Sequence, residues 1–500
     1  MKLKKLISSS EFTLFKILEV INESGLGITF CVDKNEKFIG TLSDGDIRRA
    51  ILAGVPLNTQ AFEILNRQSE SFKKILEKCA NPEMLNKLKQ ESVCAHYKSS
   101  AVDLMNLVSE RVTIIPLIDD ERKIVDYFEY KANFKIPIAS SILSGQEISN
   151  VLECLETNWI SSQGKFITQF EELFCHYIGA KYAVSVMNGT AALSLALAAL
   201  DIGVGDEVIV PDLTFAATIN SVLQVGAKPV IVDVNPDDWC ISATEIKKAI
   251  NKNTKGIIPV HLYGYPCNMD EIISICKNLN INIIEDNAEA LGGEFNNKLL
   301  GNIGTVGCYS FFGNKVITTG EGGMCTTNDE KIYQKLKVIR DHGMSREKKY
   351  WHTCFGFNYR MTNLQAAIGC GQIQRINEIL NKRDEIQKWY FENLDMNFFE
   401  PQKKPVNGRS IVWLVSVLLS SKIDKEKFIK LLNEERIDIR PFFYPLSDMP
   451  IYKPYIGGTI NSAPLISKRG INLPTLINLE KEDYKYICSK INQTLHLMAK

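Results

Sequence analysis

The stretch Ser310-Phe-Phe-Gly-Asn-Lys315-Val-Ile-Thr-Thr-Gly-Glu-Gly-Gly-Met324 places a lysine between a short apolar strand and a glycine-rich loop. Glycine permits positive φ and close backbone approach, so Gly320, Gly322 and Gly323 suit a loop folded around a ligand. A lysine desolvated against such a loop can lose its proton and act as a nucleophile. The alternative is that Lys315 is a solvated loop lysine, and the other motifs of the chain have to decide.

The composition is that of a globular protein with several domains. The chain has 500 residues, of which 45% are hydrophobic and 23% charged. Its 58 basic residues balance 58 acidic ones, so neither nucleic acid nor an anionic membrane surface is expected as the main partner. The longest apolar runs, such as residues 411–419, are too short to span a bilayer, and the N-terminus has no secretory apolar core. A cytoplasmic protein is predicted.

The cysteines favour neither disulfides nor a metal site. The chain contains 13 of them, an odd number, and no two stand at Cys-x-x-Cys spacing. We therefore expect buried free thiols and no bound metal.

Residues 1–130 show a repeated pattern of predicted elements. In the first half the pattern predicts a helix at 14–23, strands at 27–32 and 38–42, a turn at 33–36 and a helix at 47–53. In the second half it predicts a helix at 101–110, a strand at 112–118, a turn at 119–122 and a strand at 123–128. The region therefore reads as one small α+β module of two related halves.

This module, with Gly40-Thr-Leu-Ser-Asp-Gly-Asp46 at its hinge, resembles a CBS domain pair. In that family the Ser/Thr and the second Asp of such a motif often contact the ribose of an adenine nucleotide, which implies Ser43 and Asp46 here. The second half lacks the motif, because Val125-Asp-Tyr-Phe128 contains no Ser/Thr-x-x-Asp. A structural or oligomerising role is an equal alternative to nucleotide binding.

A polar linker at 131–135 leads into a second domain, which starts at Ile136-Pro137. From there helices alternate with short apolar strands, which is the pattern of a mostly parallel sheet covered on both faces. The expected strands are 183–186, 207–210, 228–232, 256–260, 282–284 and 307–311. The expected helices include 190–199, 215–224, 244–250 and 269–279. The predicted fold class of this domain is α/β.

The pattern changes at about Gln374. A long charged helix is followed by a strand at 411–419, a helix at 424–434 and a terminal helix at 481–499, which fits a smaller α+β domain. The predicted domains are therefore 1–130, 136–375 and 376–500.

Two further motifs supply what a pyridoxal phosphate site needs. Asn188-Gly-Thr-Ala-Ala192 follows a strand and opens a helix, whose free N–H groups can bind a phosphate; the alternative is a plain capped helix. Ile281-Asn-Ile-Ile-Glu-Asp286-Asn-Ala-Glu289 is a strand that ends in acidic residues, where ligands of parallel sheets bind. Asp286 is a natural partner for a pyridinium nitrogen, unless it only caps a turn. Ser310 can donate its hydroxyl to the phosphate, and Phe215 can stack on the ring unless it is a core residue.

With these motifs in place, residues 136–500 resemble the DegT-type sugar-nucleotide aminotransferases, which are fold-type-I pyridoxal phosphate enzymes. The matching motifs run in order along nearly three-quarters of the chain: Trp159-Ile-Ser-Ser-Gln-Gly164, Asn188-Gly-Thr-Ala191, Pro211-Asp-Leu-Thr-Phe215, His261-Leu-Tyr-Gly264, Glu285-Asp-Asn-Ala-Glu289, Ser310-Phe-Phe-Gly-Asn-Lys315, Thr318-Thr-Gly-Glu-Gly-Gly323 and Gly356-Phe-Asn-Tyr-Arg-Met361. So many ordered matches are specific for the family.

The resemblance implies a role for each site residue. Lys315 would anchor the cofactor covalently and carry the proton; some relatives have histidine there and are dehydratases, which Lys315 argues against. The cofactor would be held by Asp286 at the ring nitrogen, by Gly189, Thr190 and Ser310 at the phosphate, by Phe215 at the ring face, by Glu289 near the ring hydroxyl, and by Asn358 reaching a phosphate across the interface of a homodimer.

Within the family, Arg440-Pro-Phe-Phe-Tyr-Pro445, Arg469-Gly-Ile-Asn-Leu-Pro474 and Glu289 resemble the branch that aminates C4 of GDP-4-keto-6-deoxymannose to GDP-perosamine. Many relatives have glutamine in place of Glu289. The implied amino donor is L-glutamate, the implied pathway is surface polysaccharide synthesis, and the implied substrate contacts are Gln163, Arg440 and Arg469.

Two alternatives remain open. The first is the same chemistry on a UDP- or dTDP-linked 4-keto-6-deoxy sugar. The second is an inactive scaffold with a nucleotide-sensing N-terminal module, which an intact set of Lys315, Asp286 and Ser310 argues against.

Overall fold

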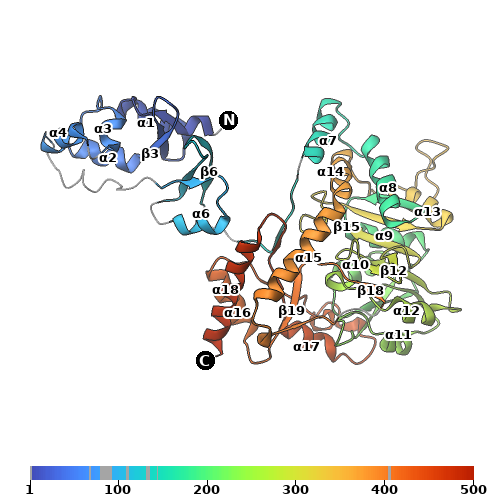
Figure 1. The fold of residues 1–500 in the computed structure, drawn as a ribbon. Coiled ribbons are helices and arrows are strands. Elements are labelled where there is room, and N and C mark those ends of the chain that lie inside the picture. Colours follow the sequence, from blue (N-terminus) through green and yellow to red (C-terminus); the bar gives the residue numbers. More distant parts are fainter. Residues whose placement is uncertain are drawn as a thin grey trace. The chain divides into compact units, whose positions relative to one another are not determined.

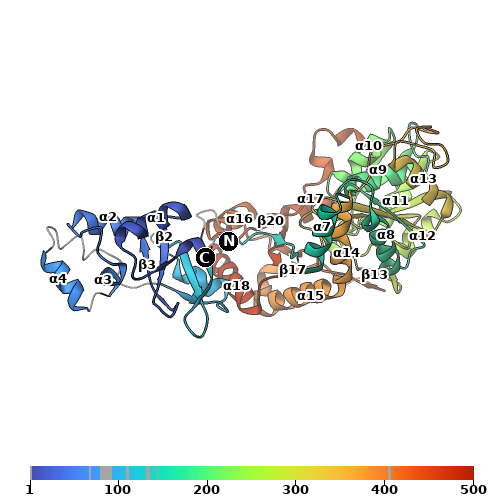
Figure 2. The same cartoon turned by 90° about the horizontal axis from the view of Figure 1, so that it is seen from above.

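The computed structural model describes residues 3–66, 69–78, 93–108, 112–130, 136–143, 145–403 and 407–499. The chain divides into two compact units, Met1–Phe134 and Lys135–Lys500, and each is described by itself (Figures 1 and 2). The expected linker at 131–135 and the end of the helix expected at 101–110 lie outside the described residues.

The described part of the chain contains no helix that is long and apolar enough to cross a membrane. Within the same residues, no three histidine, cysteine or acidic side chains are grouped so that they could hold a metal. The cysteines described are free, and most of them are buried.

The first unit consists of two halves with the same strand pairing. In the first half β1 (Ile7–Ser9) is parallel to β2 (Ile28–Val32), which is antiparallel to β3 (Phe38–Ser43). The second half repeats this order with β4 (Ala95–His96), β5 (Ile114–Ile118) and β6 (Ile124–Glu129). The helices are α1 (Leu14–Ser24), α2 (Asp44–Leu52), α3 (Ala61–Leu65), α4 (Glu70–Lys78) and α6 (Ala101–Leu107).

The repeat extends to the hydrogen bonds of the turns. Oδ1 of Asp33 accepts the N–H groups of Asn35 and Lys37, at 2.8 and 2.9 Å. Oδ1 of Asp119 accepts the N–H groups two and four residues further on, at 3.0 and 2.8 Å. The two turns meet at a bridge between Lys37 and Lys123. The structure thus shows the two related halves that the sequence predicts.

Ser43 and Asp46 form the cap of α2. The hydroxyl of Ser43 accepts the N–H of Asp46 at 3.1 Å, and Oδ2 of Asp46 accepts the N–H of Ser43 at 3.0 Å. Arg49 pairs with the other carboxylate oxygen of Asp46 at 2.8 Å. Burial alone would raise the pKa of Asp46, but the hydrogen bonds from Ser43 and Arg49 outweigh it and lower the pKa. Both residues are therefore engaged in a reciprocal helix cap.

Replacing Ser43 by alanine should lower the free energy of unfolding of the first unit by about 1 kcal/mol, because α2 loses its capping acceptor. Ser43→Thr is the matched control, since threonine also caps. Calorimetry of the full chain measures both variants. Equal stability of Ser43→Ala and the parent chain would show that the cap is energetically unimportant.

The second unit is built on a seven-stranded mixed sheet. Its order is β10-β9-β11-β12-β15-β16-β8. The bounds are β8 (Tyr182–Val186), β9 (Glu207–Pro211), β10 (Lys228–Val232), β11 (Thr254–Ile257), β12 (Asn282–Asp286), β15 (Val306–Ser310) and β16 (Gly323–Thr327). The strands from β10 to β15 are parallel to their neighbours, whereas β16 is antiparallel to both β15 and β8. The sequence predicted a mostly parallel sheet but missed β16.

Helices cover both faces of this sheet (Figure 1). Along β9, Ile209 packs into one core, whereas Val208 and Val210 pack into the other. The core on one face includes residues of α8 (Lys165–Ile178), α11 (Ala243–Ala249), α12 (Met269–Cys276) and α14 (Asn363–Gln374). The core on the other face includes residues of α9 (Gly189–Ala199), α10 (Ala217–Gln224) and α13 (Glu330–Arg340).

The C-terminal part of the unit carries a separate antiparallel sheet of order β17-β19-β21-β20. Its elements are β17 (Phe399–Pro401), β19 (Val415–Leu419), β20 (Arg440–Pro441) and β21 (Gly470–Leu473), with α15 (Ile376–Asn393), α16 (Lys425–Glu434), α17 (Ser462–Arg469) and α18 (Lys481–Met498). Short pairings join β7 (Ala139–Ser140) to β22 (Thr475–Leu476), and β13 (Glu294–Phe295) to β14 (Lys298–Leu299) and β18 (Gly408–Arg409). The strand expected at 411–419 is shorter, because it begins at Val415.

Candidate active site

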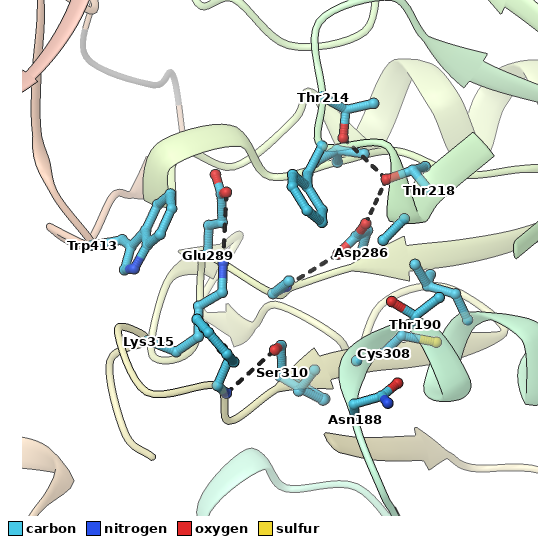
Figure 3. A pocket seen from close by; sticks show the side chains of 18 of the residues that line it. Asn188, Thr190, Thr214, Thr218, Asp286, Glu289, Cys308, Ser310, Lys315 and Trp413 are labelled. Carbon is cyan, nitrogen blue, oxygen red and sulfur yellow. Dashed lines mark hydrogen bonds and ion pairs between the residues drawn. The ribbon is translucent and has the colours of Figure 1, made fainter. Parts of the chain in front are cut away.

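A cavity of about 390 Å³ opens where β12 and β15 end and α9 begins (Figure 3). Its lining brings together seven residues predicted to bind the cofactor: Gly189, Thr190, Phe215, Asp286, Glu289, Ser310 and Lys315. Phe215 lies before α10, not inside it as expected, and its ring is 61% exposed, so it is not a core residue. The carboxyl ends of the strands and one helix N-terminus thus share a single cavity, as the sheet topology requires.

Lys315 lines this cavity, and its side chain is only 14% exposed. Its Nζ is 3.7 Å from Oε1 of Glu289 and 3.9 Å from the centre of the Trp413 ring. Burial lowers the pKa of Lys315, and the negative charges of Glu289 and Asp286 partly oppose that shift. The environment therefore favours a neutral, nucleophilic amine more than water does.

Asp286 is fixed at the end of β12. Its Oδ2 accepts the hydroxyl of Thr218 at 2.9 Å, and its Oδ1 accepts the N–H of Ala288 at 3.1 Å (Figure 3). Thr218 is in turn 3.0 Å from the hydroxyl of Thr214. Burial raises the pKa of Asp286, against the effect of these hydrogen bonds and of Lys315. A cationic group in the cavity would relieve this desolvation.

Glu289 accepts a hydrogen bond from the backbone of Tyr263, which has an unusual conformation. Its Oε2 accepts the N–H of Tyr263 at 2.9 Å, and Tyr263 adopts a left-handed conformation with φ +54°. The left-handed conformation strains the backbone of a bulky residue, and such strain is common at functional sites. Burial raises the pKa of Glu289 to about 7. Burial therefore brings the pKa values of Lys315 and Glu289 closer together than they are in water, which eases proton transfer between the two groups.

The opposite end of the cavity is shaped for an anion. Asn188 caps α9 by accepting the N–H of Ala191 at 2.8 Å. The first turn of this eleven-residue helix lines the cavity, and the N–H groups at the start of a helix can bind an anion. A Cβ on Gly189 would lie 2.7 Å from Cβ of Ser310, so only glycine lets the end of β15 approach this turn. An acid at the end of β12, an anion cradle at the start of α9 and a largely buried lysine, all in one cavity, fit pyridoxal phosphate.

Asn358 is not in the cavity of its own chain. It is exposed, and its Oδ1 accepts two hydrogen bonds from Arg360, at 3.2 and 3.1 Å. Arg360 also pairs with Asp341 at 3.0 Å.

The three predicted substrate residues also lie outside this cavity. Gln163 lines a separate hollow of about 440 Å³. Arg440 pairs with Asp438, and Arg469 pairs with Glu400, at 2.9 and 2.8 Å.

Three residues at the site were missed from the sequence. Thr218 lies in the first turn of α10, four residues after Thr214, and this spacing of two hydroxyls was the available signal. Trp413 looked like part of an apolar strand, and Phe443 like part of a substrate motif. Both reach the cavity from the C-terminal part of the chain, and no local pattern predicts that placement.

Residues 142–492 match the model of the DegT/DnrJ/EryC1/StrS aminotransferase family, so the chain belongs to this family. The class of protein is therefore an aminotransferase of fold type I, as predicted. GDP-perosamine synthase of Caulobacter vibrioides is 42% identical over 365 residues, which are 72% of this chain and 98% of that protein.

Solved structures of the family are similar as well. One is a mutant of GDP-4-keto-6-deoxymannose-3-dehydratase with bound GDP-perosamine, with a TM-score of 0.66 and 28% identity over 71% of this chain and 99% of that one. Another is the E. coli form of that dehydratase with bound hydrated pyridoxal phosphate, with a TM-score of 0.67 and 27% identity over 72% and 99% of the two chains.

Glu289→Gln should change how the stability of the cofactor-free protein depends on pH. The pKa of Glu289 rises from its ordinary value of 4.5 to about 7 on folding. The unfolded chain therefore releases this proton first, and the folded state loses about 3 kcal/mol of relative stability as the pH rises from 4.5 to 7. Glutamine removes that loss.

The measurement is urea unfolding of both proteins across this range. Glu321→Gln, at an exposed carboxylate on the rim of the same cavity, is the control and should follow the parent chain. Parallel curves for the parent and Glu289→Gln would contradict the raised pKa.

Proposed function

We propose that the chain transfers an amino group from L-glutamate to C4 of GDP-4-keto-6-deoxymannose, giving GDP-perosamine for surface polysaccharide synthesis. The observation that carries the proposal is the largely buried Lys315 in one cavity with Asp286 and the α9 anion cradle, in a chain 42% identical to a GDP-perosamine synthase over 98% of that protein. Glu289, which favoured this branch in the sequence, lies beside Lys315.

Pyridoxal phosphate, when bound, supplies an electron sink for the carbanion that forms at the amine-bearing carbon. In our proposal the residues that hold it are Asp286 at the ring nitrogen, Gly189, Thr190 and Ser310 at the phosphate, Phe215 at the ring face, Glu289 near the ring hydroxyl and Lys315 as covalent anchor.

The chain's own chemistry is proton transfer. Nζ of Lys315 takes the proton from Cα of the bound glutamate, for which burial prepares it by lowering its pKa. That proton would pass on to the bound cofactor, and in the second half-reaction the same nitrogen would take it back and deliver it to C4 of the sugar. Glu289, 3.7 Å away, stabilises the ammonium form of Lys315 each time this nitrogen carries the proton. The side chains of Trp413 and Phe443 in the lining keep water from much of the site.

Lys315→Ala should abolish transamination and the visible absorption of bound pyridoxal phosphate. Lys315→Arg should lose both too, because it keeps the positive charge but not the amine. The parent enzyme, incubated with glutamate and a panel of GDP-, UDP- and dTDP-4-keto-6-deoxy sugars, should aminate the GDP sugar fastest. Faster turnover of a UDP or dTDP sugar would replace our substrate with the alternative one. A parent chain that stays colourless with added cofactor would favour the inactive scaffold.

A homodimer is part of the proposal. Ile148, Leu152 and Leu155 follow one face of α7 (Gly145–Glu156), and each is about half exposed. Tyr350 and Phe355, on the segment that leads to Asn358, are 76% and 83% exposed. Apolar surface of this extent is typical of an interface.

Arg360 prepares Asn358 for a role across that interface. A guanidinium has only donors, so the amide oxygen of Asn358 must face Arg360, and the amide N–H₂ must face away. Asn358 thereby presents two donors to an acceptor outside its own chain's cavity. A phosphate in the partner's cavity is such an acceptor.

Mixed dimers test this arrangement. Lys315→Ala and Asn358→Ala subunits, each with little activity alone, should recover about a quarter of the parent activity when dissociated and reassociated. Half of the dimers are then hybrids, and in each hybrid one of the two sites has both residues. Lys315→Ala mixed with Asn397→Ala, a change at an exposed asparagine outside the cavity, should give half of the parent activity and controls for activity lost during dissociation and reassociation. No recovery with Asn358→Ala would place Asn358 in its own chain's site.

The first unit fits a CBS pair in our proposal. The unit has two β-α-β-β halves with a β-bridge between Lys37 and Lys123, and this repeat supports the assignment. An adenine nucleotide at Ser43 and Asp46 stays a prediction, and in the structure the two residues bond to each other. The cytoplasmic location and the division of residues 136–500 at 375/376 also stay predictions.

A further inference from the structure

One arginine is buried beneath the site with an unusual set of partners. Arg383 on α15 is 1% exposed. A buried guanidinium usually pairs with a carboxylate, but no carboxylate of the described residues forms an ion pair with Arg383. Burial lowers its pKa to about 10, which still leaves it charged at neutral pH. A buried charge without a carboxylate partner is costly, which indicates a function for Arg383 in its other contacts.

Both terminal nitrogens of Arg383 bind backbone carbonyls of the active site. Nη1 donates to the carbonyl of Trp413 at 2.5 Å, and Nη2 donates to the carbonyl of Lys315 at 3.4 Å. These two residues are adjacent at the site, since Nζ of Lys315 lies 3.9 Å from the centre of the Trp413 ring. One guanidinium thus joins two segments that are about a hundred residues apart in the chain.

A third hydrogen bond also connects Trp413 to the loop that carries Lys315. The indole N–H of Trp413 donates to the carbonyl of Asn314, the residue before Lys315, at 2.8 Å. The loop that carries Lys315 is therefore tied to Trp413 by its side chain and, through Arg383, by its backbone. A rigid, planar fork of donors suits two divergent carbonyls, and a lysine ammonium lacks that geometry.

We infer that Arg383 is a positioning residue, whose guanidinium locks the backbones of Lys315 and Trp413 so that the Lys315 amine is held against the indole face. The inference rests on the proposed function of Lys315. It adds that α15, none of whose residues lines the cavity, determines the placement of the reacting nitrogen. A misplacement of about 1 Å at a reacting atom costs about 100-fold in rate.

The test compares three variants. Arg383→Met removes the charge and both donors, Arg383→Lys keeps the charge but not the fork, and Ile386→Ala removes buried methyl groups from the same helix without touching the site. Thermal melting first identifies a temperature at which each variant is folded. We then measure kcat and KM for the GDP sugar, and the pH midpoint of the visible absorption of the pyridoxal phosphate-loaded protein.

Arg383→Met should lose about 100-fold in kcat with KM changed less than about threefold, and its spectral midpoint should shift. Arg383→Lys should lose about tenfold, and Ile386→Ala should keep the parent midpoint and kcat within about threefold. If Arg383→Met does not fold, the lysine variant decides. A parent-like midpoint and kcat in the Arg383 variants, or an equal change in Ile386→Ala, would overturn the inference.

The spectral measurement needs no sugar nucleotide. It therefore tests Arg383 even if the parent enzyme aminates none of the sugars in the panel, an outcome that would contradict only the proposed function.

Discussion

The burial of one amine beside two carboxylates is the constraint on which the second unit depends. Lys315, Asp286 and Glu289 are all withdrawn from water, and each charge removed from water costs several kcal/mol unless partners replace the solvent. The surrounding fold supplies those partners as fixed dipoles: Thr218 and a backbone N–H at Asp286, and the N–H of Tyr263 at Glu289. The pKa shifts show that the compensation is incomplete.

This incomplete compensation explains how the site is suited to its chemistry. A site that fully stabilised the ammonium would leave Lys315 protonated and unreactive. Here burial lowers the pKa of Lys315 and raises that of Glu289 to about 7, so the two pKa values lie closer together than they do in water and proton transfer between the groups is easier. The sheet provides the rigidity, since Asp286 and Ser310 end adjacent strands.

Much of the site could be predicted from the sequence because its motifs are local. A strand followed by Asp286, a strand followed by Lys315 and a capped helix at Gly189 each have a recognisable pattern, and parallel topology brings such ends together. The prediction that Gly323 belongs to a ligand-binding loop was wrong. Gly323 belongs to β16, where a Cβ would lie 2.5 Å from the carbonyl oxygen of Asn188, so strand packing requires this glycine.

The residues that could not be predicted are those placed by tertiary structure. Trp413 is about 100 residues and Arg383 68 residues away from Lys315 along the chain, and only the folded backbone shows that both contact it. In the first unit the repeat was predictable from matching turns, whereas its ligand was not. Ser43 and Asp46 satisfy each other as a helix cap, and the same two residue types serve both roles.

The central claim is that Lys315 is the covalent anchor of pyridoxal phosphate. Borohydride reduction of the loaded protein, followed by proteolysis and mass spectrometry, tests it most directly. The account predicts one phosphopyridoxyl group per chain, on the peptide that contains Lys315 and at that residue. A label on another lysine, or a loaded protein that borohydride does not label, would contradict it.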